Sequence, residues 1–334
     1  MIRVSILIPA FNAERFIGAA LASAQAQTEQ QIEILVVDDC STDSTVQIVR
    51  QAALHDKRIR LLQMDANGGP GAARNRGLAA ARGTWVAMLD ADDQFAPQRL
   101  EALIGLADRT GADIASDNLF LRSLGQDFPT KTLIPRELLR EPKRLTAAEF
   151  VAKNVGFGRR ERAAFGFMHP MFRRAFLESK AIRYDERNRF AEDYLFYLSC
   201  LLHGAVWWLS PEPMYYYTVR PGSLTEVQTS QDLNRIRNVD ANLLADPSIA
   251  ANAELSRAIR RHKSLIDRCY FYRAFTDAVK AGEYGLARSL FFESPASIKH
   301  ILHESCAQAP VIAAKALRGG YRTKNKATER IAIR

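Results

Sequence analysis

Residues 34–55 read ILVVDDCSTDSTVQIVRQAALH, and the fold can be inferred outward from this unit. Ile34–Val37 is a continuous apolar run with β-branched residues, which predicts a buried strand. A polar turn then leads into Asp43–His55, where apolar residues recur as in a helix. A continuous apolar strand followed by a helix indicates a parallel sheet, because crossover helices bury both faces of such a sheet.

The same unit recurs on both sides of this stretch through the first 120 residues. Strands are predicted at Val4–Ile8, Ile59–Met64, Trp85–Leu89 and Ile114–Phe120. Helices are predicted at Glu14–Gln27, Gly71–Ala81 and Pro97–Ala107, the last with proline near its first turn. This alternation predicts a doubly wound α/β domain, with a Rossmann-like, mostly parallel sheet and helices on both faces.

The alternation of strands and helices ends after Arg122, and the rest of the chain is organised differently. Ordered elements are predicted at Thr146–Asn154, Met168–Phe172, Ala191–His203, Val206–Leu209 and Met214–Val219. From Thr229 to about Leu317 the pattern is almost wholly helical. We therefore divide the chain into residues 1–120, 121–228 and 229–334, the last a helical region that ends in a basic tail.

The composition excludes several classes of protein. With 334 residues and 47% hydrophobic content, the chain can bury a large core and is too apolar to be disordered. Its four cysteines show no CxxC spacing, which argues against a zinc ribbon or disulfide scaffold and favours a reducing compartment. The first residues lack the apolar core and cleavage site of a secretory signal, so we expect a cytoplasmic protein.

One uncharged stretch raises the question of a membrane span. Residues 194–211, YLFYLSCLLHGAVWWLSP, carry no formal charge over 18 residues, which approaches the length of a span. His203 and Gly204 interrupt the run, and Glu192 and Asp193 stand at its start. We therefore expect a buried helix, a turn and a buried strand here.

The net charge of +9 is spread unevenly along the chain. Residues 1–130 hold 12 basic and 16 acidic side chains, whereas residues 131–189 hold 15 basic and 7 acidic ones. The last twenty residues hold 7 basic side chains and one acidic. An acidic front half argues against nucleic-acid binding, while the tail could contact anionic phospholipid or a phosphorylated substrate, or could simply be solvated.

Polar residues follow each of the first four predicted strands. These segments are Pro9–Asn12, Asp38–Asp43, Asn67–Gly71 and Asp90–Asp93. In an open parallel sheet, ligands bind beyond the carboxyl ends of the strands. The four segments therefore predict one site at this edge of the sheet, for a nucleotide, a metal ion or both.

Three carboxylates lie within the four residues Asp90-Ala91-Asp92-Asp93. They would repel one another without a cation among them. In an extended segment alternate residues point the same way, so Asp90 and Asp92 could address one ligand, and hard carboxylate oxygens favour Mg²⁺ or Mn²⁺. The alternative is that Asp93 begins the next helix as its N-cap.

Two other segments have nucleotide-binding chemistry. Asn67–Gly77 is glycine-rich and opens a helix, which exposes backbone N–H groups to phosphate, and Arg74 and Asn75 could contact a diphosphate or base. The segment is neither GxGxxG nor a P-loop, and its arginine could instead be an ordinary surface residue. Asp39 could accept a hydrogen bond from a base or a ribose, although Ser41 or Asp43 could merely cap the next helix.

Four motifs in this order, VSILIPAFN (4–12), VVDDCSTDST (36–45), NGGPGAARNRG (67–77) and LDADD (89–93), resemble the GT-A glycosyltransferases of family 2. The resemblance resumes at Phe190–Tyr197 and Tyr215–Thr225, and bacterial exopolysaccharide enzymes of the succinoglycan type are the most similar group. It implies a nucleotide-sugar donor, most often a UDP-sugar, bound by residues 1–120, with acceptor binding and catalysis in residues 121–228.

The resemblance also implies roles for individual residues. Pro9, Ala10, Phe11 and Asp39 would frame the uridine. Asp90-Ala91-Asp92 matches the DxD motif, with Asp92 the most direct metal ligand and Asp90 the second. The remaining expected contacts to the nucleotide sugar are Asn12, Glu14, Asn67, Gly68, Arg74, Asp90 and Ala91.

A base is needed because the acceptor hydroxyl loses a proton as it attacks. Glu192 and Asp193 open an apolar helix, and the resemblance to the family's "ED" motif makes Asp193 the base and Glu192 its substitute. Acidic residues at a helix N-terminus are also common for reasons of the helix dipole alone. Charge repulsion and burial could raise the pKa of Asp193 into a useful range.

Three further residues are weaker candidates. Arg220 with Ser223 could close over the diphosphate, although relatives often carry arginine where Thr218 stands. His169 could line the acceptor pocket, or could be a structural histidine with satisfied hydrogen bonds.

The sequence as a whole predicts an inverting, Mn²⁺- or Mg²⁺-dependent glycosyltransferase. We expect it to transfer a sugar, glucose from UDP-glucose, to a lipid-linked saccharide during surface or exopolysaccharide synthesis. The expected location is cytoplasmic, peripheral on the inner face of the cell membrane. The alternatives are a sugar nucleotidyltransferase and a noncatalytic nucleotide-sugar-binding assembly protein.

Overall fold

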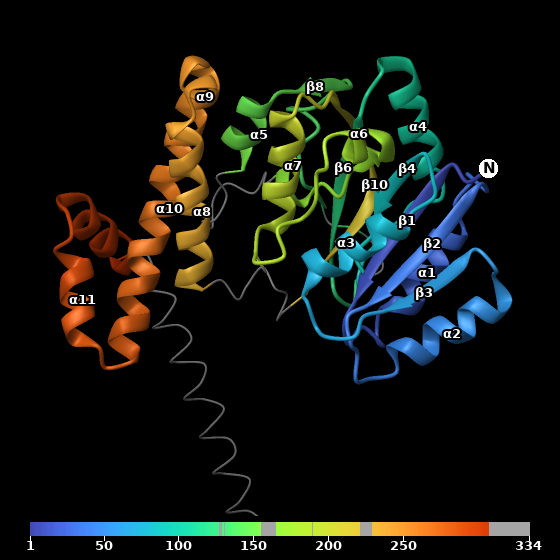
Figure 1. Cartoon of the computed structure of the whole chain (residues 1–334), viewed down its shortest axis with the longest axis horizontal. Coiled ribbons are helices and arrows are strands. Elements are labelled where there is room, and N and C mark those ends of the chain that lie inside the picture. The colour runs from blue at the N-terminus through green and yellow to red at the C-terminus, as the bar shows by residue number, and fades with distance from the viewer. Residues whose placement is uncertain (127–128, 130, 155–164, 189, 221–228, 307–334) are drawn as a thin grey trace, which may run out of the picture. The chain divides into compact units, whose positions relative to one another are not determined.

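The structure is a computed structural model, which describes residues 1–126, 129, 131–154, 165–188, 190–220 and 229–306. One mixed sheet organises the first 220 residues (Figure 1). Its strand order is β3-β2-β1-β4-β9-β6-β10-β5. The strands are β1 (Val4–Ala10), β2 (Ile32–Asp38), β3 (Ile59–Gln63), β4 (Trp85–Met88), β5 (Gln94–Phe95), β6 (Ile114–Ser123), β9 (Met171–Arg173) and β10 (Trp207–Val219). Two short strands, β7 (Lys131–Thr132) and β8 (Lys143–Leu145), pair with β6 and β10.

The first four strands form one parallel part of this sheet. β1 lies between β2 and β4, in a register that places Ile6 beside Ile34 and Ala87. Every residue of β2 is buried, which is the reason for its continuous apolar sequence. The prediction of a parallel, doubly wound first part is confirmed.

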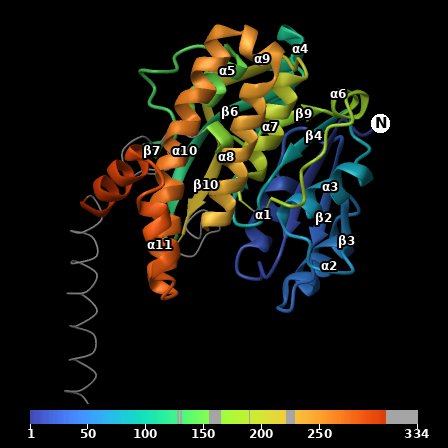
Figure 2. The same ribbon diagram turned by 60° about the vertical axis from the view of Figure 1, so that its left-hand side comes forward.

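Helices connect these strands and cover the sheet (Figures 1 and 2). They are α1 (Ile17–Gln25), α2 (Thr45–His55), α3 (Pro70–Ala80) and α4 (Arg99–Thr110). α3 packs on β1 and β2, and α4 packs on β6 and β10. The approach of α3 to β1 is close, because a Cβ atom on Gly77 would lie 2.4 Å from Leu7 Cδ1.

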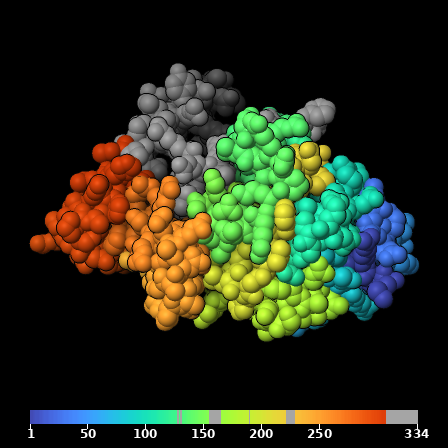
Figure 3. Space-filling view, turned by 90° about the horizontal axis from the view of Figure 1, so that it is seen from above, coloured from blue at the N-terminus to red at the C-terminus, as the bar shows by residue number. Residues whose placement is uncertain are grey.

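The second half of the sheet differs from a purely parallel one. β9 runs antiparallel between β4 and β6, with Met171 paired to both Ala87 and Ala115. This short strand joins the two halves into one continuous sheet, and Figure 3 shows the green and yellow residues of the second half packed directly against the cyan residues of the first. β6 and β10 are again parallel, so most paired residues of the sheet are parallel, as predicted, but β9 at its centre and the short strands β5, β7 and β8 are antiparallel.

β10 corrects one expectation. The sequence predicts two strands, Val206–Leu209 and Met214–Val219, whereas the structure has one strand, Trp207–Val219, whose pairing with β6 shifts register on both sides of Pro213. Proline has no N–H to donate to the neighbouring strand, so the regular pairing with β6 is interrupted at Pro213. The strand passes this point as an irregularity and its pairing resumes at Tyr215.

The uncharged stretch at 194–211 folds as predicted. Helix α7 (Glu192–Leu202) is followed by a turn with Gly204 at φ 89°, and then by β10. Within the described part of the chain, no helix combines the length and apolar character that a membrane span requires.

Three shorter elements complete this part of the chain. α5 (Ala147–Lys153) begins with a capping box, in which Thr146 and Glu149 bond each other's backbone N–H groups. The 3₁₀ turn η1 (Phe165–Phe167) and helix α6 (Arg174–Ser179) flank β9. The helix predicted at Thr146–Asn154 is thus present.

The described chain forms two compact units. One contains the described residues up to 220 together with 243–262, and the other contains residues 229–242 and 263–306. The helices of the C-terminal region are α8 (Ser230–Ala245), α9 (Pro247–Ala251), α10 (Ala253–Lys280) and α11 (Tyr284–Phe291), followed by helical residues 295–306. Because the unit boundaries cross α8 and α10, these two helices belong partly to each unit. The basic tail lies outside the described residues.

Candidate active site

The loop after β1 is bonded to the loop after β2. Asn12 Oδ1 accepts a hydrogen bond from the Thr42 N–H at 2.8 Å, and the Asn12 N–H donates to Ser41 Oγ at 2.9 Å. Glu14 adds a second link, because its carboxylate accepts from the Ser44 N–H at 3.0 Å. The expected nucleotide-binding residues Asn12 and Glu14 therefore hold two loops together. Phe11 lies on this edge with 53% of its surface exposed.

Asp39 organises the glycine-rich loop before α3. Its two carboxylate oxygens accept from the N–H groups of Gly68 and Gly69, each at 2.8 Å, and its carbonyl accepts from Asn67 Nδ2 at 3.0 Å. Gly69 has φ 83°, a conformation that favours glycine. Asp39, Asn67 and Gly68 thus meet at the carboxyl edge, as predicted, while Pro9 and Ala10 belong to β1 beside them.

The acidic segment after β4 is a turn and not an extended strand. The Asp93 N–H donates to the Asp90 carbonyl at 3.0 Å, which closes residues 90–93 into one turn. The expectation that Asp90 and Asp92 point the same way in an extended segment is therefore wrong in its premise. Asp92 instead forms an ion pair with Arg220.

Asp93 is buried under this turn. Its carboxylate accepts from the Tyr215 hydroxyl at 2.8 Å and from the Thr218 N–H at 2.7 Å. Since α4 begins only at Arg99, the alternative that Asp93 caps this helix is wrong. Burial and the nearby charges of Asp92 and Asp90 raise the pKa of Asp93 well above its usual range.

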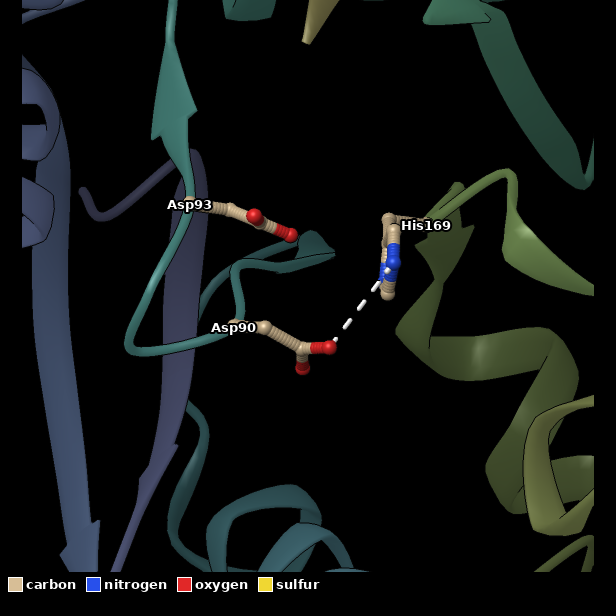
Figure 4. A group of neighbouring side chains, drawn as sticks. All are labelled: Asp90, Asp93 and His169. Carbon is tan, nitrogen blue, oxygen red and sulfur yellow. Dashed lines mark ion pairs between the residues drawn. The ribbon is translucent and has the colours of Figure 1, made fainter. Parts of the chain in front are cut away.

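His169 lies opposite the turn (Figure 4). Its Nε2 is 3.8 Å from Asp90 Oδ2, and one ligand atom from each of Asp90, Asp93 and His169 lies within 4.8 Å of the others. The imidazole is 2% exposed, and neither ring nitrogen has a hydrogen-bond partner among the described residues. Burial lowers the pKa of His169, which favours the neutral ring.

These residues fit a divalent cation. Burial and the charge of Asp90 raise the pKa of Asp92, and burial with the charges of Asp92 and Asp90 raises that of Asp93, so their neighbours do not fully stabilise the ionised forms of these carboxylates. Carboxylate oxygens, joined by a neutral imidazole nitrogen, are ligands that Mg²⁺ or Mn²⁺ accepts. A cation here would remove the repulsion.

Arg74 connects the acidic turn to the first turn of α7. Its guanidinium lies 2.9 Å from Asp90 Oδ1, 2.8 Å from Glu192 Oε1 and 3.2 Å from Asp193 Oδ2. The Arg74 side chain is only 3% exposed, so it is neither a surface residue nor free to turn toward solvent. The structure therefore brings the two expected catalytic acids beside Asp90.

Asp193 has the electrostatic character of a general base. Burial raises its pKa to about 6 against the opposing charge of Arg74, and the charge of Glu192 adds to the increase. A carboxylate with such a pKa is ionised near neutral pH and is more basic than an exposed one.

Asp92 also lines a cleft of about 310 Å³, together with Arg15, Phe16, Arg122 and others. Arg220 crosses toward it, with its guanidinium carbon 5.3 Å from the centre of the Phe16 ring. Ser223, the expected partner of Arg220, lies outside the described residues.

Comparison with known proteins agrees with this geometry. Residues 5–176 match the family model described as glycosyl transferase family 2. The chain belongs to this family. It is 42% identical over 244 residues to the succinoglycan biosynthesis protein ExoO of Rhizobium meliloti, covering 73% of this chain and 66% of that protein. It is 33% identical over 299 residues to ExoU of the same organism, covering 90% and 85%.

Solved structures share the fold of this family 2 glycosyltransferase. Residues 1–349 of Staphylococcus aureus TarS in complex with UDP-GlcNAc align with a TM-score of 0.63 at 20% identity, over 86% of this chain and 90% of that one. The mannosyltransferase PcManGT of Pyrobaculum calidifontis, in complex with GDP-Man and Mn²⁺, aligns with a TM-score of 0.55 at 17% identity, over 92% and 86%. The predicted GT-A fold and glycosyltransferase class are confirmed.

Sequence reasoning missed two features of this glycosyltransferase. The Tyr184 hydroxyl donates to Asp193 Oδ1 at 3.1 Å, and no local pattern around Tyr184 indicates this contact. A fully buried ion pair joins Arg99 to Asp117 at 2.7 Å, and Arg99 also donates to the His169 carbonyl at 2.8 Å. For this pair there was a signal, because an aspartate inside the apolar run of β6 requires a buried partner.

Proposed function

We propose that this glycosyltransferase transfers a sugar from a UDP-sugar to a saccharide acceptor, with inversion, in exopolysaccharide synthesis. The observation that carries the proposal is the link through buried Arg74 between Asp90, at the expected donor site, and Asp193, whose pKa of about 6 suits a base. The succinoglycan names of two relatives support the biological role. Glucose from UDP-glucose is the donor that we propose to test first.

The donor would lie along the carboxyl edge of β1, β2 and β4. Pro9, Ala10, Phe11 and Asp39 would frame the uridine, and the bonded loops of Asn12, Glu14, Asn67 and Gly68 would give this frame its shape. Support for a uridine nucleotide comes from the TarS complex with UDP-GlcNAc, which shares the fold.

Asp90 and Asp92, with Ala91 between them, would hold Mn²⁺ or Mg²⁺ against the diphosphate, and the buried Asp93 and His169 beside Asp90 are the alternative ligands for this cation. When bound, such a cation stabilises the negative charge of a leaving diphosphate. Arg220 forms an ion pair with Asp92. Together with Ser223, it would close over the bound diphosphate. The ion pair with Arg74 would hold the Asp90 carboxylate in its orientation.

Asp193 would accept the proton of the attacking acceptor hydroxyl. One displacement at the anomeric carbon inverts its configuration, and the base must then act from the side opposite the leaving group. Glu192 lies beside it as a second acid. If Asp92 and not His169 binds the cation, His169 would form part of the floor under the acceptor.

We also propose a lipid-linked acceptor, reached from the inner face of the membrane with help from the basic tail. Its support is the excess of positive charge in the last twenty residues. Salt-sensitive binding of the full chain to phosphatidylglycerol vesicles, and not to phosphatidylcholine vesicles, is the test of this part.

The function is tested by incubating the protein with UDP-, GDP- and dTDP-sugars and with Mn²⁺, Mg²⁺ or EDTA, and measuring release of the nucleoside diphosphate. We expect slow hydrolysis of one UDP-sugar, abolished by EDTA. Asp193→Asn should lower this rate about 10²–10⁴-fold with donor binding retained, since that is the range that a positioned base supplies. Asp185→Asn, at a nearby exposed carboxylate, is the matched control. A folded protein that binds none of these donors in the presence of metal would refute the proposal.

A further inference from the structure

The two carboxylate oxygens of Asp193 have different partners. Oδ2 lies 3.2 Å from the Arg74 guanidinium, and Oδ1 accepts a hydrogen bond from the Tyr184 hydroxyl at 3.1 Å. The Asp193 side chain is 17% exposed, so part of it still faces solvent. A carboxylate oxygen has two lone pairs, and each of these contacts uses one. As far as the described residues show, one lone pair on each oxygen therefore stays available for an acceptor hydroxyl.

Tyr184 is itself held in place. Its ring stacks on Phe196 of α7, with ring centres 4.0 Å apart and planes within 3°. Its backbone makes a reciprocal pair with Asn75 of α3, since its N–H donates to Asn75 Oδ1 and its carbonyl accepts from Asn75 Nδ2, each at 2.9 Å. Asn75 thus fixes Tyr184, which differs from the contact to a diphosphate or base expected from the sequence. With only 3% of its surface exposed, Tyr184 cannot swing away from Asp193 without opening this packing.

We propose that Tyr184 is a positioning residue for the reaction, which holds the carboxylate plane of Asp193 so that its free lone pairs face the acceptor hydroxyl. This inference rests on the proposed role of Asp193 as base. Arg74 alone contacts one oxygen and would leave the carboxylate free to rotate about its Cβ–Cγ bond. With Tyr184 on the other oxygen, both ends are fixed, and fixed geometry is what gives a general base its efficiency.

The charged groups around Asp193 give this arrangement a measurable signature. Arg74 faces it from α3, Glu192 from α7, His169 from the segment before β9, and Asp90 from the end of β4. Burial dominates and raises the pKa of Asp193 to about 6. A phenol that donates to the carboxylate favours its ionised form, so loss of that hydroxyl should raise the pKa further.

The experiment compares Tyr184→Phe with Tyr197→Phe in the full chain. Tyr197 is the control for loss of a nearby buried hydroxyl that is not bonded to Asp193, because it is fully buried on α7 within range of the charge of Asp193, and its hydroxyl has no hydrogen-bond partner among the described residues. The readout is the pH dependence of metal-dependent UDP release from the donor that the panel identifies, together with the affinity for that donor. For Tyr184→Phe we expect the acid limb of kcat to move up by about one pH unit, and thus about a tenfold loss below pH 6, with donor affinity unchanged. Tyr197→Phe should follow the wild-type profile.

The variants distinguish the positioning role of Tyr184 from the role of Asp193 as base. A Tyr184→Phe profile that superimposes on wild type overturns the positioning role, even when Asp193→Asn is inactive and the base assignment stands. Equal losses in Tyr184→Phe and Tyr197→Phe, with the acid limb unmoved, also overturn it, because both variants would then act through packing alone. If Asp193→Asn keeps wild-type activity, the proposed base itself is wrong, and this failure is separate from the first two.

Discussion

Arg74 is the residue on which the candidate active site depends most. It lies in the first half of α3 and contacts Asp90, which is close to it in sequence. It also contacts Glu192 and Asp193, which are more than a hundred residues further along the chain. A buried cation among several carboxylates is stabilising only while all partners are present. Its removal should therefore affect stability as well as catalysis.

Arg74→Met tests this expectation. It leaves buried carboxylates without their common cation, so we expect a loss of about 3–5 kcal/mol in the free energy of unfolding at pH 7.5. The loss should shrink toward pH 5, because the unpaired Asp193 has a still higher pKa in the folded variant and becomes neutral by taking up a proton. Urea unfolding at the two pH values measures both quantities.

The control for this substitution is Arg187→Met. Arg187 pairs with Asp185 at the surface, with 86% of its side chain exposed, so its loss should change stability little. A small, pH-independent effect of Arg74→Met would contradict the role that we assign to its ion pairs.

Among the elements, α3 packs closely against the sheet at Gly77. A methyl group on Gly77 would lie within 3.0 Å of three side-chain atoms of Leu7, which is fully buried in β1. Gly77→Ala should cost about 1–3 kcal/mol, since helix or strand must shift to make room. The thermal midpoint of the variant measures this cost.

Gly18→Ala is the control substitution, because Gly18 lies in a helix, α1, without a close neighbour. In α1, a methyl group on Gly18 meets nothing within 4 Å, so the better helix propensity of alanine should stabilise the protein by up to about 1 kcal/mol. If both substitutions have the same sign, close packing of α3 on β1 is not what requires Gly77.

The elements also show what the sequence could predict and what it could not. Strands and helices up to residue 120 follow from local patterns, because each apolar run and each polar turn reports its own burial. The sequence also predicts an ordered element at Met168–Phe172, but three residues of β9 do not report which strands they pair with, so its insertion between β4 and β6 has no local record. The contacts of Tyr184 with Asp193 and of Arg74 with Glu192 depend on that long-range arrangement, so motifs could name the acids but not the residues that hold them.

The whole molecule consists of two units, and the proposed donor site belongs to the one with residues 1–228 and 243–262. We expect a UDP-sugar with Mn²⁺ to stabilise this unit by about 2.7 kcal/mol at a ligand concentration one hundred times Kd. Hydrogen exchange of its most protected peptides should slow by up to about hundredfold, and EDTA should reverse the effect.

Peptides from residues 263–306 serve as the internal comparison in the same experiment. They belong to the other unit, and we expect their exchange to stay unchanged. Slowing there to the same extent would mean that the two units unfold together. Unchanged exchange throughout residues 1–120 would contradict the donor site.

The position of β9 has a consequence during synthesis of the chain. β4 ends at Met88, but the strand that covers its free edge starts only at Met171. At ~5–20 residues per second, a ribosome needs several seconds to produce the 82 residues between them. Throughout this time the nascent chain carries the unpaired edge of an apolar strand, which is a template for pairing with other chains. Protection of newly made protein by a chaperone is therefore most needed between the synthesis of residues 88 and 171.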